Sequence, residues 1–221
     1  LSPNEITVSR RHLSARKFLI ASGSTWRDDH IPGLDEVAHH TPQTILSLKR
    51  PPKTLFVVGS GTTAMELAYL FSTFGSKVYV AKRVTYARGG QQHSVRVDEI
   101  LIADDRLPTT DIGLENAGVA YTEHGIQVSE AMQTSARHIF AAGSVVDLQA
   151  QTHTILSHSR TAAHNLLHRN FIALDDRPRL TIAFTDPQIA RTGLDEDDCL
   201  RRDLKVSIAL APLTLTARSN I

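Results

Sequence analysis

Residues 54–68 read TLFVVGSGTTAMELA, an apolar run that passes through Gly-x-Gly-x-x-Ala directly into a helical pattern. Gly59 permits the tight turn out of the strand, Gly61 lets backbone approach a pyrophosphate, and Ala64 lets the helix pack closely. The free N–H groups at the helix start favour negative charge. The stretch therefore predicts a strand–turn–helix that binds a dinucleotide through Gly59, Ser60, Gly61, Thr62, Thr63 and Ala64.

The residues around this fingerprint complete a βαβ unit. Residues 65–74 are amphipathic, Gly75 is a typical helix C-cap, and residues 77–81 form the next strand. Upstream, Thr41 is a suitable N-cap for a short helix with proline at its first position. Pro51-Pro52 then indicates a domain junction before the fingerprint strand.

Further apolar runs predict the remaining elements. We expect additional strands over residues 99–103, 138–143, 181–184 and 206–210. We expect helices over residues 114–117, 152–168 and 195–202. Alternation of strands and helices indicates an α/β fold.

Composition indicates an ordinary cytoplasmic protein. Of 221 residues, 41% are hydrophobic, and the net charge of +1 offers no attraction to nucleic acid or an anionic membrane. The apolar runs have the length of strands, and nothing resembles a signal peptide. The single cysteine, Cys199, rules out an intrachain disulfide. We therefore expect no nucleic-acid or membrane partner.

The order of motifs resembles the flavin-dependent pyridine nucleotide-disulfide oxidoreductases, such as dihydrolipoamide dehydrogenase and mercuric reductase. The resemblance implies Rossmann-like FAD- and NAD(P)-binding domains, followed by the start of an α+β interface (dimerisation) domain. It is carried by residues 18–24, 31–34, 58–66, 101–109, 139–145, 184–187 and 192–194.

The resemblance also implies how the chain is divided. Residues 1–40 would be a segment of the FAD domain, and residues 41–105 the NAD(P)-binding domain. Residues 106–172 would return to the FAD domain, and residues 178–221 would form part of the dimerisation domain. The full-length parent would be a homodimer.

The family's chemistry implies FAD and NAD(P)H, with hydride passing from nicotinamide to flavin and then to a disulfide, metal-ion or quinone-type acceptor. Glu66 matches the family's catalytic glutamate at the flavin–nicotinamide junction. The turns that would contact the flavin comprise Ala21, Ser22, Gly23, Gly143 and Ser144.

The choice between NADH and NADPH depends on the end of the second strand of the βαβ unit. NAD binders usually place an acid there, whereas basic residues accommodate a 2′-phosphate. Lys82 and Arg83 stand at this position, which favours NADP. The alternative is that both are solvated surface cations.

Several family features are missing from these residues. The chain contains neither a first FAD fingerprint nor a Cys-x4-Cys pair, and residues 83–97 are too few to complete a βαβαβ half. Ser144 replaces an aspartate, and Asp104-Asp105 replace a Thr-Gly pair. We therefore expect the 221-residue polypeptide alone to bind FAD poorly and to be nearly inactive.

Two other functions remain open. One is a catalytically inactive dinucleotide-binding or interaction module derived from the same scaffold. The other is an unrelated NAD-dependent dehydrogenase with one Rossmann unit, against which the two flavin-like turns argue. His164 and His168 have the i,i+4 spacing of metal ligands, but no local third ligand completes the set, so we expect no metal site.

Overall fold

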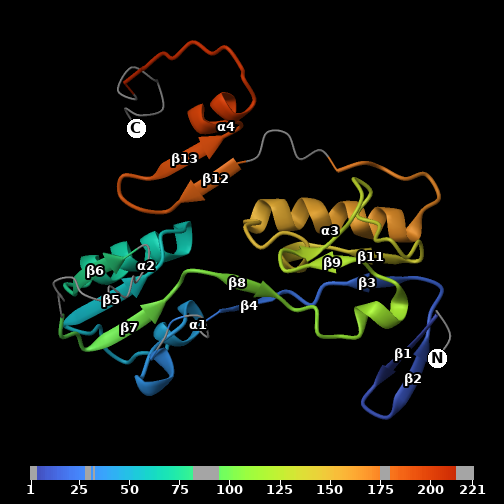
Figure 1. Ribbon diagram of the computed structural model, residues 1–221, viewed down its shortest axis with the longest axis horizontal. Helices are drawn as coiled ribbons and strands as arrows, with labels where there is room; N and C mark the ends of the chain where they lie inside the picture. The colour runs from blue at the N-terminus through green and yellow to red at the C-terminus, as the bar shows by residue number, and fades with distance from the viewer. Residues whose placement is uncertain (1–3, 28–30, 32, 82–94, 175–179, 213–221) are drawn as a thin grey trace.

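The computed structural model describes residues 4–27, 31, 33–81, 95–174 and 180–212. Its elements form two α/β bodies joined by a pair of crossing strands, with a hairpin and a short helix above them (Figure 1). We call the two bodies the fingerprint body, residues 33–81 and 95–104, and the β3–β11 body, residues 15–23 and 109–174.

The fingerprint body is a parallel sheet of three strands with the order β6-β5-β7. β5 (Thr54–Val58) leads through the glycine turn into α2 (Thr62–Thr73), and β6 (Lys77–Ala81) and β7 (Glu99–Ile102) flank β5. The predicted strand–turn–helix is confirmed. Its core consists of Ile45, Leu55, Val57, Ala64, Leu67, Ala68, Phe71, Leu101 and Ala103.

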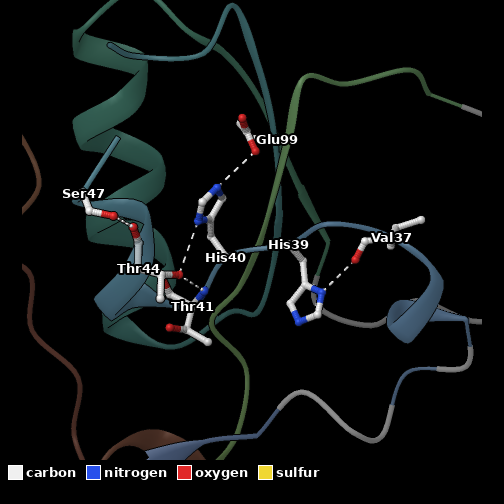
Figure 2. A network of polar contacts seen from close by, with 7 residues as sticks. All are labelled: Val37, His39, His40, Thr41, Thr44, Ser47 and Glu99. Atoms are coloured by element: carbon white, nitrogen blue, oxygen red, sulfur yellow. Dashed lines mark hydrogen bonds and ion pairs between the residues drawn. The ribbon is translucent and has the colours of Figure 1, made fainter. Parts of the chain in front are cut away.

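The segment that precedes α1 forms backbone hydrogen bonds with the outer edge of β7. His40 forms a parallel bridge to Leu101, and its ring lies between two side chains (Figure 2). Nε2 is 3.1 Å from Glu99 Oε2, and Nδ1 is 3.3 Å from Thr44 Oγ1. These contacts dock α1 (Pro42–Ile45), which follows a 3-10 turn, η1 (Leu34–Glu36), against the sheet.

The β3–β11 body is built from segments far apart in the chain. β3 (Phe18–Ile20) pairs in parallel with β11 (Ile139–Ala141), and α3 (Thr152–Leu167) packs on both strands. Its remaining elements are η2 (Leu114–Ala117), β9 (Tyr121–Thr122), β10 (Gly125–Ile126) and η3 (Gly143–Val145). One buried cluster is formed by Leu114, Val119, Ile126, Ile139, Ala141 and Val145.

Two strands connect the bodies. β4 (Ser24–Trp26) and β8 (Arg106–Pro108) run antiparallel between them, so the chain leaves and returns along one narrow ribbon (Figure 1). An N-terminal hairpin of β1 (Glu5–Val8) and β2 (Arg11–Ser14) extends from the β3–β11 body.

The C-terminal described residues form a hairpin and one short helix. β12 (Leu180–Ala183) pairs with β13 (Ile189–Thr192), and Asp195 caps α4 (Glu196–Arg201) as its acidic start predicts. The expected strand over residues 206–210 is wrong, because that segment has no regular secondary structure and pairs with no other described strand. Its apolar side chains are accordingly exposed, and Leu210 is 95% accessible.

Candidate dinucleotide-binding site

Gly59, the first glycine of the fingerprint, is required by the protein's own backbone. Its φ of +135° lies in a region that other residues rarely adopt. A Cβ there would lie 2.4 Å from Ala103 O and 3.1 Å from Asp104 N. Gly59 therefore lets the end of β5 touch the segment that follows β7.

Gly61, the second glycine, has no such requirement. Its φ of −71° suits any residue, and a Cβ would meet nothing within 4 Å. It is the N-cap of α2, a twelve-residue helix with no side-chain cap and no acid in its first turn. In the described part of the chain, the N–H groups of Thr62, Thr63 and Ala64 have no hydrogen-bond acceptor. A position without a side chain, next to free N–H donors, suits an anionic group.

The sheet order places this turn where ligands bind in open α/β sheets. β6 lies on one side of β5 and β7 on the other, so the strand order reverses at the carboxyl ends of β5 and β7. Gly59 and Ser60 follow β5 at that edge, and Asp104 and Asp105 follow β7. Two carboxylates therefore stand at the same edge as the glycine turn.

The two flavin-like turns meet at one edge of the β3–β11 pair. Because β3 and β11 are parallel, their carboxyl ends lie at the same edge. Ala21, Ser22 and Gly23 therefore follow β3 at the edge where Gly143 and Ser144 follow β11. Gly23 has a φ of +78°, and its Cβ position is 3.8 Å from Ser144 Oγ. The structure thus brings together five predicted residues from segments about 120 residues apart in the chain.

Glu66 lies on α2, one turn beyond the free N–H groups. Its Oε1 accepts the N–H of Phe184, at 2.9 Å, from the residue that follows β12. Beside it is an open hollow of about 410 Å³ between α1, α2 and Phe184. The hollow is lined by Pro42, Leu46, Thr63, Glu66, Leu67, Tyr69, Leu70 and Phe184. In this structure the carboxylate holds a backbone segment in place.

Arg106 and Ser24 are site candidates that the sequence prediction missed. Arg106 lies on β8 with its guanidinium 5.0 Å from the centre of the Trp26 ring, and burial lowers its pKa. Its Nε and the Ser24 Oγ are buried and make no hydrogen bond in the described part of the chain. A half-buried cation beside a buried hydroxyl suits a phosphate or sugar hydroxyl. The available signal was the arginine within residues 101–109, one of the segments that carry the family resemblance.

Four other residues that the sequence singles out are Lys82, Arg83, His164 and His168. Lys82 and Arg83 lie outside the described residues. The His164 and His168 rings stack at 4.3 Å, and each engages a backbone carbonyl, of Asn170 and His164 respectively. No group of three metal-binding side chains occurs in the described ranges.

Comparison with known proteins gives the family. The sequence matches the pyridine nucleotide-disulphide oxidoreductase family over residues 2–89 and 81–165. The chain belongs to this family. It is 28% identical to the mercuric reductase of Staphylococcus aureus and 27% identical to the dihydrolipoyl dehydrogenase of Thermus scotoductus. These alignments cover 97% and 98% of the chain, and 48% and 57% of the relatives.

A solved structure gives the fold independently. The HOCl-induced flavoprotein disulfide reductase RclA of Escherichia coli superposes with a TM-score of 0.75 at 20% identity. The superposition covers 99% of this chain and 60% of that protein. The predicted fold, Rossmann-like FAD- and NAD(P)-binding domains, is thereby confirmed. The chain spans about half the length of the relatives that it matches.

The family match consists of two segments of the chain. The two segments overlap over residues 81–89, from the last residue of β6 onward. The alignment to the S. aureus relative has 260 positions, so at least 39 of them, the difference from 221, have no counterpart here.

Within the described ranges, no helix has both the length and the apolar character needed to cross a bilayer.

Proposed function

We propose that this chain forms the cofactor-binding part of an FAD-dependent NAD(P)H oxidoreductase. Hydride would pass from the nicotinamide to the flavin, and electrons then to a disulfide, metal-ion or quinone-type acceptor. The observation that carries the proposal is Gly61, since neither its backbone angles nor its neighbours require a glycine. A bound pyrophosphate explains why the position lacks a side chain.

In this proposal, different residues bind NAD(P)H and the flavin. The N–H groups at the start of α2 bind the NAD(P)H pyrophosphate, and Glu66 flanks the nicotinamide. Lys82 and Arg83 favour NADP through its 2′-phosphate. The turns at Gly23 and Gly143 approach the flavin, which supplies the two-electron acceptor when bound.

The residues fit the two cofactors unequally. The open space at Gly61 suits a dinucleotide, and the buried polar atoms of Arg106 and Ser24 suit part of FAD. The only glycine fingerprint of the chain is the one in the fingerprint body, so these residues offer no second cradle for the FAD phosphates. The polypeptide tested alone is therefore expected to bind NADPH more tightly than FAD and to turn over slowly.

The division of the chain follows the same proposal. Residues 1–40 and 106–172 belong to the flavin domain, residues 41–105 to the nucleotide domain, and residues 178–221 to a dimerisation domain. The parent protein is a cytoplasmic homodimer. Support for the last domain comes from α4, which has no buried residue among its six.

A second candidate is a catalytically inactive nucleotide-binding module. Ser144 and the Asp104-Asp105 pair favour it, because they replace residues that the resemblance associates with flavin and nucleotide binding. The two candidates differ in one measurable property, since only the first reduces a bound flavin with NADPH.

Gly61→Val tests the proposal. A valine side chain would fill the space in front of α2, so the dissociation constant for NADPH should rise well over tenfold. The unfolding midpoint should fall only by the cost of losing a glycine N-cap, because an added Cβ meets no protein atom within 4 Å. Fluorescence titration measures the affinity, with Thr73→Val at the far end of α2 as the control. Unchanged affinity in Gly61→Val contradicts the proposal.

A further inference from the structure

Side chains from other elements bind one edge of β12. Gln151 Nε2 donates to Ile182 O at 2.7 Å, and Gln151 Oε1 accepts from Ile182 N at 2.9 Å. His153 Nε2 is 3.0 Å from Leu180 O, and Glu66 Oε1 is 2.9 Å from Phe184 N. A single carboxamide therefore satisfies both backbone groups of Ile182.

The spacing of these contacts follows from strand geometry. Backbone groups of alternate residues point to the same edge of a strand, and residues 180, 182 and 184 are alternate residues. The other edge of β12 pairs with β13, with Ile182 opposite Ala190. The three side chains thus occupy the place of a neighbouring strand.

These side chains come from the two different bodies. Gln151 is the N-cap of α3 and follows the Gly143 turn of the β3–β11 body. Glu66 belongs to α2 of the fingerprint body. Two residues of extended strand span roughly 7 Å, so β12 sets a short, fixed separation between its two attachments. β12 is accordingly a bridge from α3 to α2 (Figure 1).

The bridge matters because the other connection between the bodies is weak. The bodies are joined through the chain by β4 and β8, a two-stranded ribbon of three residue pairs. A ribbon of two strands has little stability alone and twists readily. A third attachment away from that ribbon restrains rotation of one body relative to the other.

We infer that Gln151 is a positioning residue that, with His153 and Glu66, holds β12 as a strap between the two cofactor-binding bodies. The strap fixes the separation of the glycine turn at Gly61 from the turns at Gly23 and Gly143. Glu66 then has two separable properties: its oxygen anchors the strap, and its charge acts at the nicotinamide. The inference relies on the proposed function only for the identity of the ligands.

Distances between spin labels test the strap without any nucleotide. Labels at Thr73→Cys on α2 and Arg160→Cys on α3, both exposed, are placed in a Cys199→Ser background. The folded chain should give one narrow distance distribution. Gln151→Leu should lose it and give a broad one, because leucine neither donates to nor accepts from Ile182. The same change at the exposed Gln149 is the matched control and should leave the distribution narrow.

Glu66 variants separate the strap from the charge. Glu66→Gln retains an acceptor oxygen for Phe184 N and should keep the narrow distribution, whereas Glu66→Leu should broaden it. In Gln151→Leu, amide exchange at Ile182 should rise about tenfold, as expected for two lost hydrogen bonds. An unfolding midpoint near wild type shows that both bodies remain folded.

Two results overturn the inference. One is a Gln151→Leu distribution as narrow as that of Gln149→Leu, and the other is a broad distribution in Glu66→Gln. A failure of NADPH to bind would contradict the proposed function but would leave the label distances unchanged. The two ideas therefore fail in different measurements.

Discussion

The fingerprint body and the β3–β11 body use similar strand-end turns but assemble them differently. In the fingerprint body, β5, the turn, α2 and β6 follow one another within residues 54–81. In the β3–β11 body, the two turns come from strands separated by more than a hundred residues. A local motif can be recognised from spacing alone, whereas a site assembled by long-range pairing is recognised only through resemblance to known proteins.

Gly59→Ala should cause the largest loss in the free energy of unfolding, and it should destabilise the fingerprint body selectively. The added Cβ would overlap Ala103 O at 2.4 Å, and φ of +135° would be strained. Overpacking and backbone strain together cost about 2–6 kcal/mol. Denaturant unfolding measures the loss, and amide exchange should show β7 separating from β5. Gly61→Ala, which meets no neighbour, is the control; an equal cost there would refute the steric account.

Gly125→Ala makes the corresponding change in the β3–β11 body. Its Cβ would lie 2.5 Å from Val145 O with φ at +134°, so the cost should be similar or slightly smaller, about 2–5 kcal/mol. NADPH binding should survive, because the fingerprint turn is in the other body. Gly118→Ala has a strained φ of +68° but no clash, and it isolates the strain component. Loss of NADPH binding in Gly125→Ala would show that the bodies do not act separately.

Removing the negative charge beside the glycine turn should have a smaller effect, on NADPH affinity. Asp104 and Asp105 follow β7 at the edge where the pyrophosphate is proposed to bind, so the double change to Asn should strengthen NADPH binding about threefold to tenfold. The gain should shrink at high ionic strength, because salt screens exposed charges. Asp111→Asn is the control at an exposed aspartate. Weaker binding in the double variant would mean that these carboxylates bind the nucleotide.

The smallest expected effect is on stability, through the hydrogen bonds between Thr54 at the start of β5 and Asp98 just before β7. Asp98 Oδ2 accepts the hydroxyl and the N–H of Thr54 at 2.9 and 2.8 Å, and the hydroxyl bond chiefly lowers the Asp98 pKa below its ordinary value of 3.8. A lowered folded pKa stabilises the fold above the unfolded pKa, and the stabilisation disappears as pH falls through the folded pKa.

Melting curves of wild type and Asp98→Asn between about pH 7 and about pH 3 measure this contribution. The variant should melt slightly lower near neutral pH, and the difference should vanish in acid. A difference that stays constant with pH would exclude the carboxylate charge as its cause. Asp111→Asn again serves as the control.

The sequence predicted about half of the elements and part of the site. Residues 54–81 were predictable because their turn, helix and strand signals are local, and α4 was predictable from its acidic start. The segment 206–210 was not, because an apolar alternating run becomes a strand only if a partner is available. Arg106 was not chosen because its importance depends on burial against Trp26, and spacing does not reveal burial.

The role of Gln151 could not be predicted from the sequence either. A glutamine before a helix is a common surface residue, and its contact with Ile182 joins positions 31 residues apart. The attachment of Glu66 to Phe184 spans 118 residues. Such contacts depend on how the two bodies face each other, which no local pattern encodes.

The parallel pairing of β3 with β11 has a consequence for the order of folding. Phe18 pairs with Ile139, 121 residues later, whereas the fingerprint sheet is complete at Ile102. At about 5–20 residues per second, a ribosome takes about 6–24 seconds to make the intervening chain. During that time β3 has no β11 to pair with, while the fingerprint sheet can already form. The fingerprint body is thus able to fold first and to present a finished surface to the β3–β11 body.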